Sequence, residues 1–593
     1  MKHPFKGASR KIAAIAALSL VASVVPVSMS SAAKVASPKQ GGDITVGIFN
    51  TLPLEGFCFG NPANGALGVL KTVYEGLFEQ RSDGRIVPHL AESATPTPDY
   101  KTWVIKIRSG VKYHDGTDFN VANAILNLQA IRGYYFAGAV AQTGGTSTPG
   151  ALAVVHTVGS GVPFTANIKD VRPVSADSFA VELWNPQIDL PETMYASGRF
   201  FMRSSAILAP GSVSKCVAAG AGTGPFVVSK YSQTDVTVVR NSNYWRKDKD
   251  GNALPYLNSI NFKYVNQATQ RANGLRSGTL DAAMFTSAGE IKQIVNVQAN
   301  KNLRTIASPD DYYAMNMFNT AIEPFNNKNA RLAVSYAFDR DTFYRQRNCF
   351  QGKCVGSIPT SIVGKRNVMF NKQGFVGFDL AKAKAAVAAY KTETGKDLTF
   401  QLPSDTSAEA QASAKAFAQI MKKAGITVGI LTQDTATITS NAFPSPSSGK
   451  VNPYQMYPTT VFEGTGTSFT LPFLVSNMFT APNNRTLANF GALGALFGGF
   501  GRAINPGRFT DATQDSLVYG GWYDTTSDRP AKLRAATKYI QENAMVLPAP
   551  TIQYLFGFVS DMKGFDTFTL AAGGRGRPMT NAGVNWTGVY IDN

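Results

Sequence analysis

The chain has 593 residues, of which 44% are hydrophobic and 16% are charged. These values exclude an intrinsically disordered chain, and they predict more than one domain because a single core rarely grows past about 250–300 residues. The formal net charge is +18, yet no five basic residues are consecutive. The sequence therefore lacks the clustered basic patch of nucleic-acid binding, and we expect a dispersed positive surface that associates loosely with anionic polymers or lipids.

The N-terminus has the pattern of an export signal. Lys2, Arg10 and Lys11 precede the apolar stretch Ile12–Val27, and Ser31-Ala32-Ala33 supplies small residues where a signal peptidase cleaves. We expect residues 1–33 to be a signal peptide, and the protein to be periplasmic or on the cell surface. A retained membrane anchor is the alternative, although the stretch is short for a bilayer span. No cysteine lies near the expected cleavage site, so the sequence does not support a lipid-anchored lipoprotein.

The next expected elements run to about residue 130. Asp43–Phe49 is a predicted strand, and Thr102–Arg108 alternates apolar and polar side chains as a half-buried strand does. A short strand at Val111–Tyr113 lies between two turn sequences. Asp118 is a candidate N-cap for the helix that begins near Val121. Residues 132–168 are rich in Gly, Ala and Thr and are expected to form a long loop.

From residue 227 onward the sequence predicts both strands and helices. The expected strands are Val227–Tyr231, Val236–Arg240 and Ile426–Leu431. The expected helices are Ala381–Tyr390, Ala408–Ala424 and Asp528–Ala544. In the second of these helices Phe417, Ile420 and Met421 share one face, and Gly425 ends it.

Four cysteines in an exported chain suggest disulfides: Cys58, Cys216, Cys349 and Cys354. Cys349 and Cys354 would close a short loop with Gly352 at its turn, and Cys58 and Cys216 would remain. Three pairings are possible, and the sequence does not choose among them. A zinc site is the weaker alternative, because no second close Cys or His pair completes four ligands.

Several motifs follow one another in a fixed order. They are Tyr74-Glu75-Gly76-Leu77, residues 88–93 (PHLAES), residues 108–116 (RSGVKYHDG), residues 222–226 (GTGPF), residues 241–245 (NSNYW) and residues 329–340 (NARLAVSYAFDR). This order resembles the extracytoplasmic solute-binding proteins of family 5, which serve peptide- and nickel-type ABC importers and include dipeptide- and oligopeptide-binding proteins. Matches recur from about residue 44 to 560.

The resemblance implies a fold and a domain layout. The expected fold is α/β, the two-lobe periplasmic-binding-protein-like fold (type II) with an extra subdomain inserted in lobe I. Lobe I would hold residues 43–310 and 550–593, with the subdomain at about 78–210, and lobe II would hold 311–549. Two crossing segments, near 308–316 and 546–552, would act as a hinge that closes on a ligand.

The resemblance also implies a function without catalysis. The protein would be a monomer without metal or cofactor that captures a peptide or similar small solute and passes it to a membrane permease. A secreted hydrolase of peptides or glycans is the alternative, but no nucleophile–base or carboxylate-pair motif supports it. A surface adhesin is a third hypothesis, and it predicts that the protein has no closable cleft. Metal transport is not supported, because the sequence contains no cluster of histidines. The Gly220–Pro225 loop resembles a phosphate loop but precedes a strand instead of a helix.

The ligand contacts are expected mainly among aromatic side chains in loops. The candidates are Phe57, Trp245, Asn319, Tyr457, Phe462, Glu463 and Trp522. Relatives that bind peptides hold the terminal ammonium through an acid in a W-x-x-D-x-x-DP-like segment. The corresponding window, Asn452–Pro482, lacks the Trp and the Asp-Pro and has Glu463 as its only charged residue. We therefore predict that Glu463 contacts a cationic ligand group, with a solvated loop Glu as the alternative; a peptide, a sugar, an opine-like compound or another amide remains open as the ligand.

Overall fold

The computed structural model describes residues 38–49, 64–131, 165–195, 200–208, 220–232, 234–287, 289–308, 313–442, 451–461, 470–476, 505–580 and 583–592. Their strands form one sheet of seven strands, one of four, one of three and several two-stranded pairs, in a mixed α/β arrangement. Throughout these ranges, no helix combines the length and the apolar character that crossing a membrane requires.

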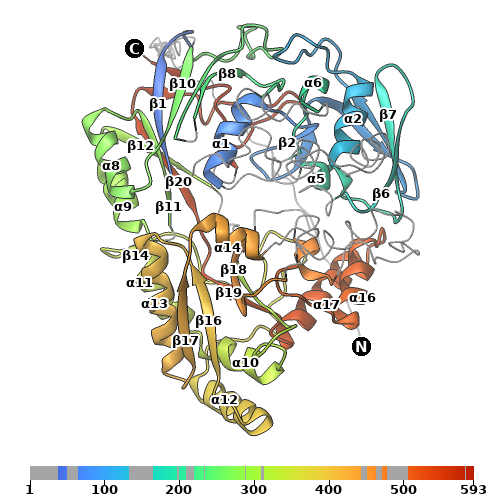
Figure 1. Ribbon diagram of the computed structural model, residues 1–593. Helices are drawn as coiled ribbons and strands as arrows, with labels where there is room; N and C mark the ends of the chain where they lie inside the picture. Colours follow the sequence, from blue (N-terminus) through green and yellow to red (C-terminus); the bar gives the residue numbers. More distant parts are fainter. Residues whose placement is uncertain are drawn as a thin grey trace, which may run out of the picture. The chain divides into compact units, whose positions relative to one another are not determined.

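The seven-stranded sheet has the order β12-β20-β11-β1-β10-β9-β8 (Figure 1). Its strands are β1 (Asp43–Ile48), β8 (Phe226–Tyr231), β9 (Asp235–Arg240), β10 (Ser259–Tyr264), β11 (Ala282–Thr286), β12 (Leu303–Ala307) and β20 (Tyr554–Val559). β1 pairs in parallel with β10 and β11, and the other pairs are antiparallel. The predicted strands at residues 43–49, 227–231 and 236–240 are confirmed.

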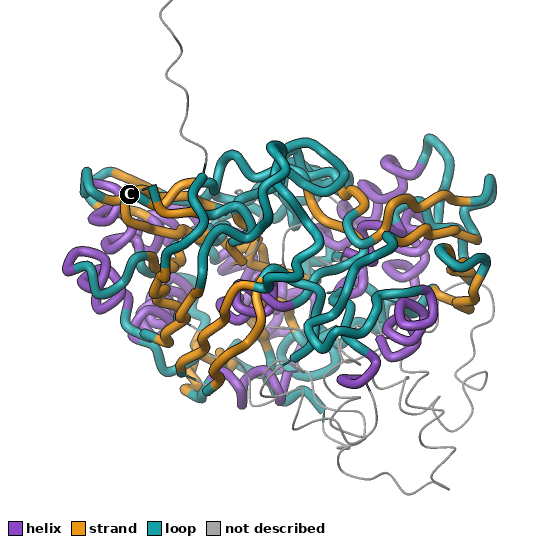
Figure 2. The backbone as a smooth tube through the Cα atoms, turned by 90° about the horizontal axis from the view of Figure 1, so that it is seen from above, coloured by secondary structure: helices purple, strands orange, loops and turns teal. Residues whose placement is uncertain are grey.

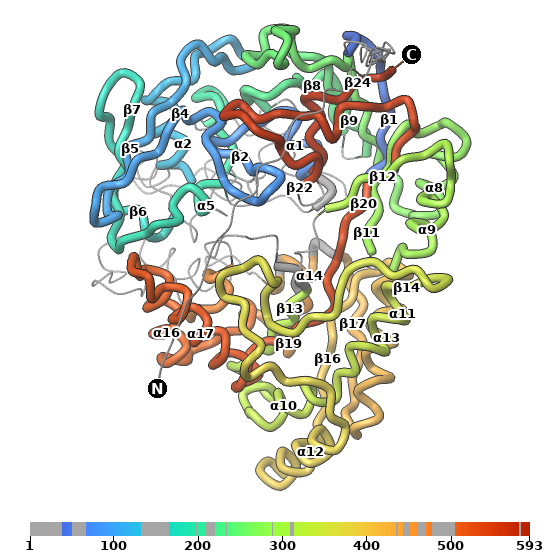
Figure 3. Tube along the Cα trace, turned by 180° about the vertical axis from the view of Figure 1, so that it is seen from behind, coloured from blue at the N-terminus to red at the C-terminus, as the bar shows by residue number. Residues whose placement is uncertain are grey.

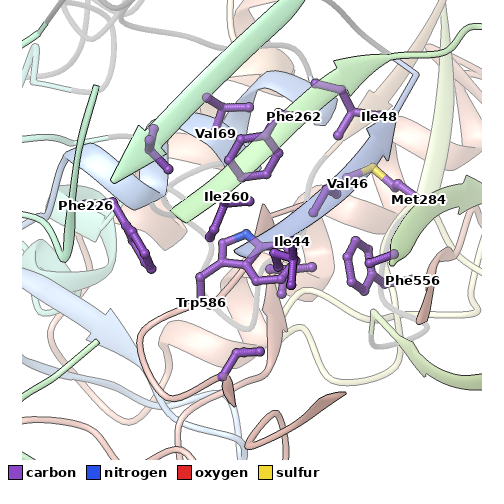
Figure 4. Close-up of a cluster of buried hydrophobic side chains, with 14 of the residues drawn as sticks. Ile44, Val46, Ile48, Val69, Phe226, Ile260, Phe262, Met284, Phe556 and Trp586 are labelled. Carbon is purple, nitrogen blue, oxygen red and sulfur yellow. The ribbon is translucent and has the colours of Figure 1, made fainter. Parts of the chain in front are cut away.

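Both faces of this sheet are covered, as alternation along β11 shows. Met284 belongs to the apolar cluster with α1 (Asn64–Val73), while Phe285 belongs to the cluster with α8 (Ala268–Ser277) and α9 (Ile291–Ala299). Strand side chains alternate between faces, so β11 and β20 contribute to both clusters, whereas the buried apolar residues of β1, β8, β9 and β10 belong to the first cluster. Figure 4 shows the first cluster, where Phe262 and Phe556 lie beside Trp586 from the C-terminal segment.

A second, antiparallel sheet has the order β4-β5-β7-β6. It consists of β4 (Ala91–Pro96), β5 (Thr102–Ile107), β6 (Ile168–Pro173) and β7 (Ser178–Leu183), and it shares a core with α2 (Val121–Ile131) and α5 (Leu190–Tyr195). Figure 2, which views the chain from above, shows strands with helices beside them toward both sides of the view. The predicted strand at 102–108 is confirmed.

Two local predictions in this part are wrong. The helix cap is Asn120, whose side-chain oxygen accepts the backbone N–H of Asn123 at 2.9 Å. Asp118 instead accepts a hydrogen bond from Lys112 at 2.6 Å, across an isolated bridge between these two residues. That bridge is also the extent of the strand expected at Val111–Tyr113.

The remaining part of the chain is built on a three-stranded antiparallel sheet, β18-β13-β19. The strands are β13 (Tyr313–Phe318), β18 (Met456–Val461) and β19 (Val546–Ala549). Met315 and Met317 of β13 face a cluster that includes α16 (Ala512–Trp522) and α17 (Arg529–Glu542). Ala314 and Phe318 face a second cluster with α10 (Lys328–Ala337), α12 (Leu380–Thr394) and α13 (Ala408–Lys422).

The parallel pair β16 (Thr399–Ser404) and β17 (Thr427–Thr432) is joined through α13. The side chain of Ser407 accepts the N–H of Ala410 and caps α13, and Gly425 adopts a φ of 84° after its end. Phe417, Ile420 and Met421 are buried, as their spacing predicts. The expected helices at residues 381–390, 408–424 and 528–544 are all present.

The chain passes directly from one sheet system to the other after β19. Pro550–Gln553 link β19, which pairs with β13, to β20, which pairs with β11 and β12. The Gln553 side chain donates to the backbone carbonyl of Ser308 at 2.7 Å, and Thr551 N–H donates to the Ser357 carbonyl at 2.9 Å. Figure 3 shows this passage through the middle of the view.

Cys349 and Cys354 are bonded in the structure, with an S–S distance of 2.08 Å. They lie opposite each other in the hairpin of β14 (Cys349–Phe350) and β15 (Lys353–Cys354), where Gly352 has a φ of 75°. Cys58 and Cys216 lie outside the described residues, as does the expected signal peptide, so their pairing remains a prediction.

Candidate functional site

A pocket of about 320 Å³ lies where β16 ends. Its lining comes from β13, β16, β18, α13, α11 (Arg340–Asn348) and α14 (Thr435–Ala442). Ser404 is the last residue of the parallel strand β16, and Asp405 follows it. In α/β sheets, crevices outside the carboxyl ends of parallel strands are common ligand sites, because the connecting loops meet there.

Arg347 of α11 is the cationic side chain of this pocket. It is half-buried, and burial lowers the pKa of its guanidinium to about 10. Among the described residues, its Nε has no hydrogen-bond partner and no carboxylate forms an ion pair with it. Its aromatic neighbour is Phe343, with the guanidinium carbon 5.5 Å from the ring centroid. A desolvated guanidinium without a counter-ion favours an anionic ligand group.

Asp405 is the acidic side chain of the same pocket and is half-exposed. Its Oδ1 accepts the backbone N–H of Ser407 at 2.8 Å, which fixes the carboxylate just before α13 begins. Its backbone carbonyl accepts Gln411 Nε2 at 2.6 Å. The pocket therefore presents one cation and one anion from separate elements, which suits a ligand that carries both charges.

The rest of the lining is largely apolar. Phe343, Phe417 and Met456 are buried there beside Tyr457, whose pKa burial raises to about 12. Asn316 adds an amide, although its Nδ2 already donates to the Leu547 carbonyl at 3.2 Å. Such a surface binds the carbon skeleton of a solute, while the few polar groups fix its orientation.

The predicted ligand contacts are mostly not brought together here. Tyr457 lines the pocket. Asn319 is buried, and its Nδ2 donates to the carbonyls of Asn452 and Tyr454, which gives it a structural role. Trp522 is buried in the cluster beneath the three-stranded sheet and stacks on Tyr523. Phe57, Phe462 and Glu463 lie outside the described residues, so their roles remain predictions.

Trp245 instead belongs to a buried polar cluster around Glu75. The Glu75 carboxylate accepts hydrogen bonds from four side chains: Thr223 at 2.8 Å, Tyr244 at 2.6 Å, Trp245 at 2.9 Å and the His89 ring at 2.8 Å. These five residues come from four of the sequence motifs singled out above. Four of the six motifs therefore meet at a buried carboxylate that joins distant segments, whereas Phe338 of the motif at residues 329–340 lines the pocket.

Electrostatics at Glu75 are set by these partners. Burial raises the pKa of Glu75, but the charge of His89 and the hydrogen bonds from His89, Tyr244 and Trp245 outweigh it and hold the pKa below its usual value. The Nδ1 atom of His89 has no partner among the described residues and borders a cavity of about 40 Å³, which has room for water. No group of three His, Cys, Asp or Glu side chains capable of holding a metal occurs in the described ranges.

Arg347 and Asp405 were not among the residues that the sequence singled out. Asp405 follows β16 at the edge where ligands bind in α/β sheets, but that strand was not predicted from the sequence. No sequence signal singles out Arg347, because Arg345 lies only two positions away on the same helix and yet is exposed. Which of the two arginines faces the pocket depends on how α11 packs.

Comparison with known proteins adds the following. A family model described as bacterial extracellular solute-binding proteins, family 5 Middle, matches residues 85–484. The glutathione-binding protein GsiB of Escherichia coli (strain K12) is 28% identical over 309 residues, which cover 50% of this chain and 52% of that protein. GsiB of Salmonella typhimurium is 29% identical over 307 residues with the same coverage. The chain thus aligns with about half the length of these curated relatives.

Solved structures resemble the chain over almost its whole length. The periplasmic binding protein AgaA from A. tumefacien R10, in complex with agropinic acid, has a TM-score of 0.73 and 20% identity, covering 93% of this chain and 99% of AgaA. DppA from Helicobacter pylori, in complex with the peptide STSA, has a TM-score of 0.71 and 15% identity, covering 94% and 99%. At these identities the likeness shows the fold, which is the two-lobe type II periplasmic-binding-protein fold.

Proposed function

The chain belongs to the bacterial extracellular solute-binding proteins of family 5, and we propose that it is the substrate-binding component of an ABC importer. It captures a small solute without chemical turnover and delivers it to the transmembrane subunits of a permease. Export by the N-terminal signal segment would place it in the periplasm or at the cell surface, where it acts as a monomer.

The observation that carries this proposal is the pocket with Arg347 and Asp405 on its lining. A guanidinium binds a carboxylate through two parallel hydrogen bonds, and the bond gains strength where water is excluded. A carboxylate such as Asp405 binds an ammonium group in the same way. We therefore assign the ligand to small solutes that carry a carboxylate and an amine, with peptides as the leading class.

The ligands of similar proteins support this class. Those proteins bind glutathione, agropinic acid, the peptide STSA and the dipeptide Met-Leu. Peptides carry a terminal carboxylate, and agropinic acid is an acid by name, so a cation in the pocket suits each of them. Ni(L-His) is the ligand of another similar structure, but no metal-holding group occurs in the described ranges here.

The proposed mechanism is closure of two lobes around the solute. Lobe I would comprise residues 43–310 and 550–593, with the inserted subdomain at about 78–210, and lobe II residues 311–549. The membership of the strands supports these boundaries, because β19 and β20 belong to different sheets and are joined by Pro550–Gln553. Rotation about such short connections brings two surfaces together over a ligand.

Hydrolysis is not favoured by the pocket. Its described lining contains one carboxylate, Asp405, and no histidine, so it lacks both a nucleophile–base pair and a pair of carboxylates.

The test is mass spectrometry of solute released by denaturing the purified protein, followed by calorimetry with a panel of dipeptides, tripeptides, glutathione and agropinic acid. We expect stoichiometric binding of at least one compound, recovered unchanged. Chemical conversion of a bound compound would support a hydrolase, and no bound solute together with no binding across the panel would contradict the proposed function.

A further inference from the structure

A buried ion pair joins two parts of the chain that have separate cores. Arg529 Nη2 lies 2.7 Å from Asp189 Oδ2, although 340 positions separate the two residues. Asp189 precedes α5, which shares a core with the four-stranded sheet, and Arg529 begins α17, which packs under the three-stranded sheet. Figures 1 and 3 agree that α5 and α17 lie to one side of the β19–β20 passage, and that β14 and α9 lie on its other side.

The pair is shielded from water and held in place. The side chains of Arg529 and Asp189 are 10% and 9% exposed. Gln187 Nε2 donates to Asp189 Oδ1 at 3.1 Å and to Thr193 Oγ1 at 2.7 Å, which orients the aspartate. Removing one member of a buried pair strands the other charge, and such losses cost far more than those of surface pairs.

Apolar side chains from the two parts also meet in one cluster. This cluster contains Phe200 and Leu208, which come from the part with the four-stranded sheet, together with Trp522 and Leu533 of α16 and α17. The contact between the two parts is thus polar and apolar, and separating them would expose both kinds of surface.

We propose that the Asp189–Arg529 pair is a latch that favours the closed arrangement of the two lobes before any solute binds. The latch goes beyond the proposed solute binding, since it sets how often the pocket is covered. It acts through the lobe arrangement, so Asp189 and Arg529 are positioning residues and do not contact the solute.

Small-angle X-ray scattering of the dialysed full-length protein, without added solute, tests the latch independently of the ligand's identity. The variants are Arg529→Gln, Asp189→Asn and the double variant. Arg534→Gln is the matched control, because Arg534 is an exposed arginine of the same helix. Circular dichroism checks that each variant is folded.

We expect both single variants to have a larger radius of gyration than the wild type and the control. The double variant should be no more open than either single variant, because both substitutions break the same pair. Scattering curves of folded Arg529→Gln and Asp189→Asn that match the wild type would overturn the latch.

Discussion

Replacing Glu75 should lower the free energy of unfolding of the protein substantially. Its carboxylate is 7% exposed and accepts hydrogen bonds from His89, Thr223, Tyr244 and Trp245. Removing one partner of a buried charged network costs about 3–5 kcal/mol, because the remaining polar groups stay buried without partners. For Glu75→Ala we expect a loss of this size, which is a large fraction of the roughly 5–15 kcal/mol by which a protein is stable.

Glu75→Gln removes the negative charge but keeps the shape of the side chain. The amide oxygen can still accept hydrogen bonds, but the NH₂ group faces side chains that were donors, and the Trp245 indole has no acceptor to offer it. We expect this variant to lose less than Glu75→Ala. Because the pKa of Glu75 is lowered in the folded state, its stabilisation is present above the ordinary value near 4.5 and is lost as the pH falls below it. The glutamine variant should show a weaker acid dependence.

Guanidinium unfolding followed by tryptophan fluorescence and circular dichroism measures both effects. A free energy of unfolding for Glu75→Ala within about 1 kcal/mol of the wild-type value at pH 7 would refute the view that the sequence motifs meet at a carboxylate essential for folding.

Two further predictions concern residues chosen from the sequence. In protein purified without reductant, alkylation should find no free thiol at Cys349 or Cys354, and free thiols at both positions would contradict this. Replacing both cysteines by serine should lower the free energy of unfolding by less than the ~3 kcal/mol given for a fifteen-residue loop, because the loop closed here is shorter. Glu463→Gln should weaken binding of the copurified solute in calorimetry by about 2–5 kcal/mol if Glu463 holds a cationic group, whereas unchanged affinity would assign Glu463 to the surface.

Much of the fold could be predicted because local signals agreed with tertiary packing. The apolar spacing of Phe417, Ile420 and Met421, together with Gly425 after them, defined both the helix α13 and the start of the following strand. The cap of α2 could not be chosen in this way. Asp118 and Asn120 are both good capping residues, and the choice depends on the partner that Lys112 offers to Asp118 across the bridge.

The candidate site was harder to predict because its residues gain their roles only through packing. Trp245 was indistinguishable from other loop aromatics, yet its indole N–H donates to a carboxylate 170 positions away. Arg347 and Arg345 have the same local sequence pattern, and only the packing of α11 turns Arg347 toward the pocket. The resemblance to a family predicted the architecture, but its most regular motifs mark Glu75 and its partners instead of the ligand pocket.

The central claim is that Arg347 binds the carboxylate of a captured solute. Calorimetry should compare wild type, Arg347→Gln and the matched control Arg345→Gln, using the copurified solute or the panel compound that binds, and its carboxamide. Losing a buried charge partner costs about 2–5 kcal/mol, so Arg347→Gln should weaken carboxylate binding by roughly 30-fold or more, with little effect of the control. The carboxamide should bind wild type and Arg347→Gln alike. Equal affinity of wild type and Arg347→Gln for the carboxylate compound would contradict the account.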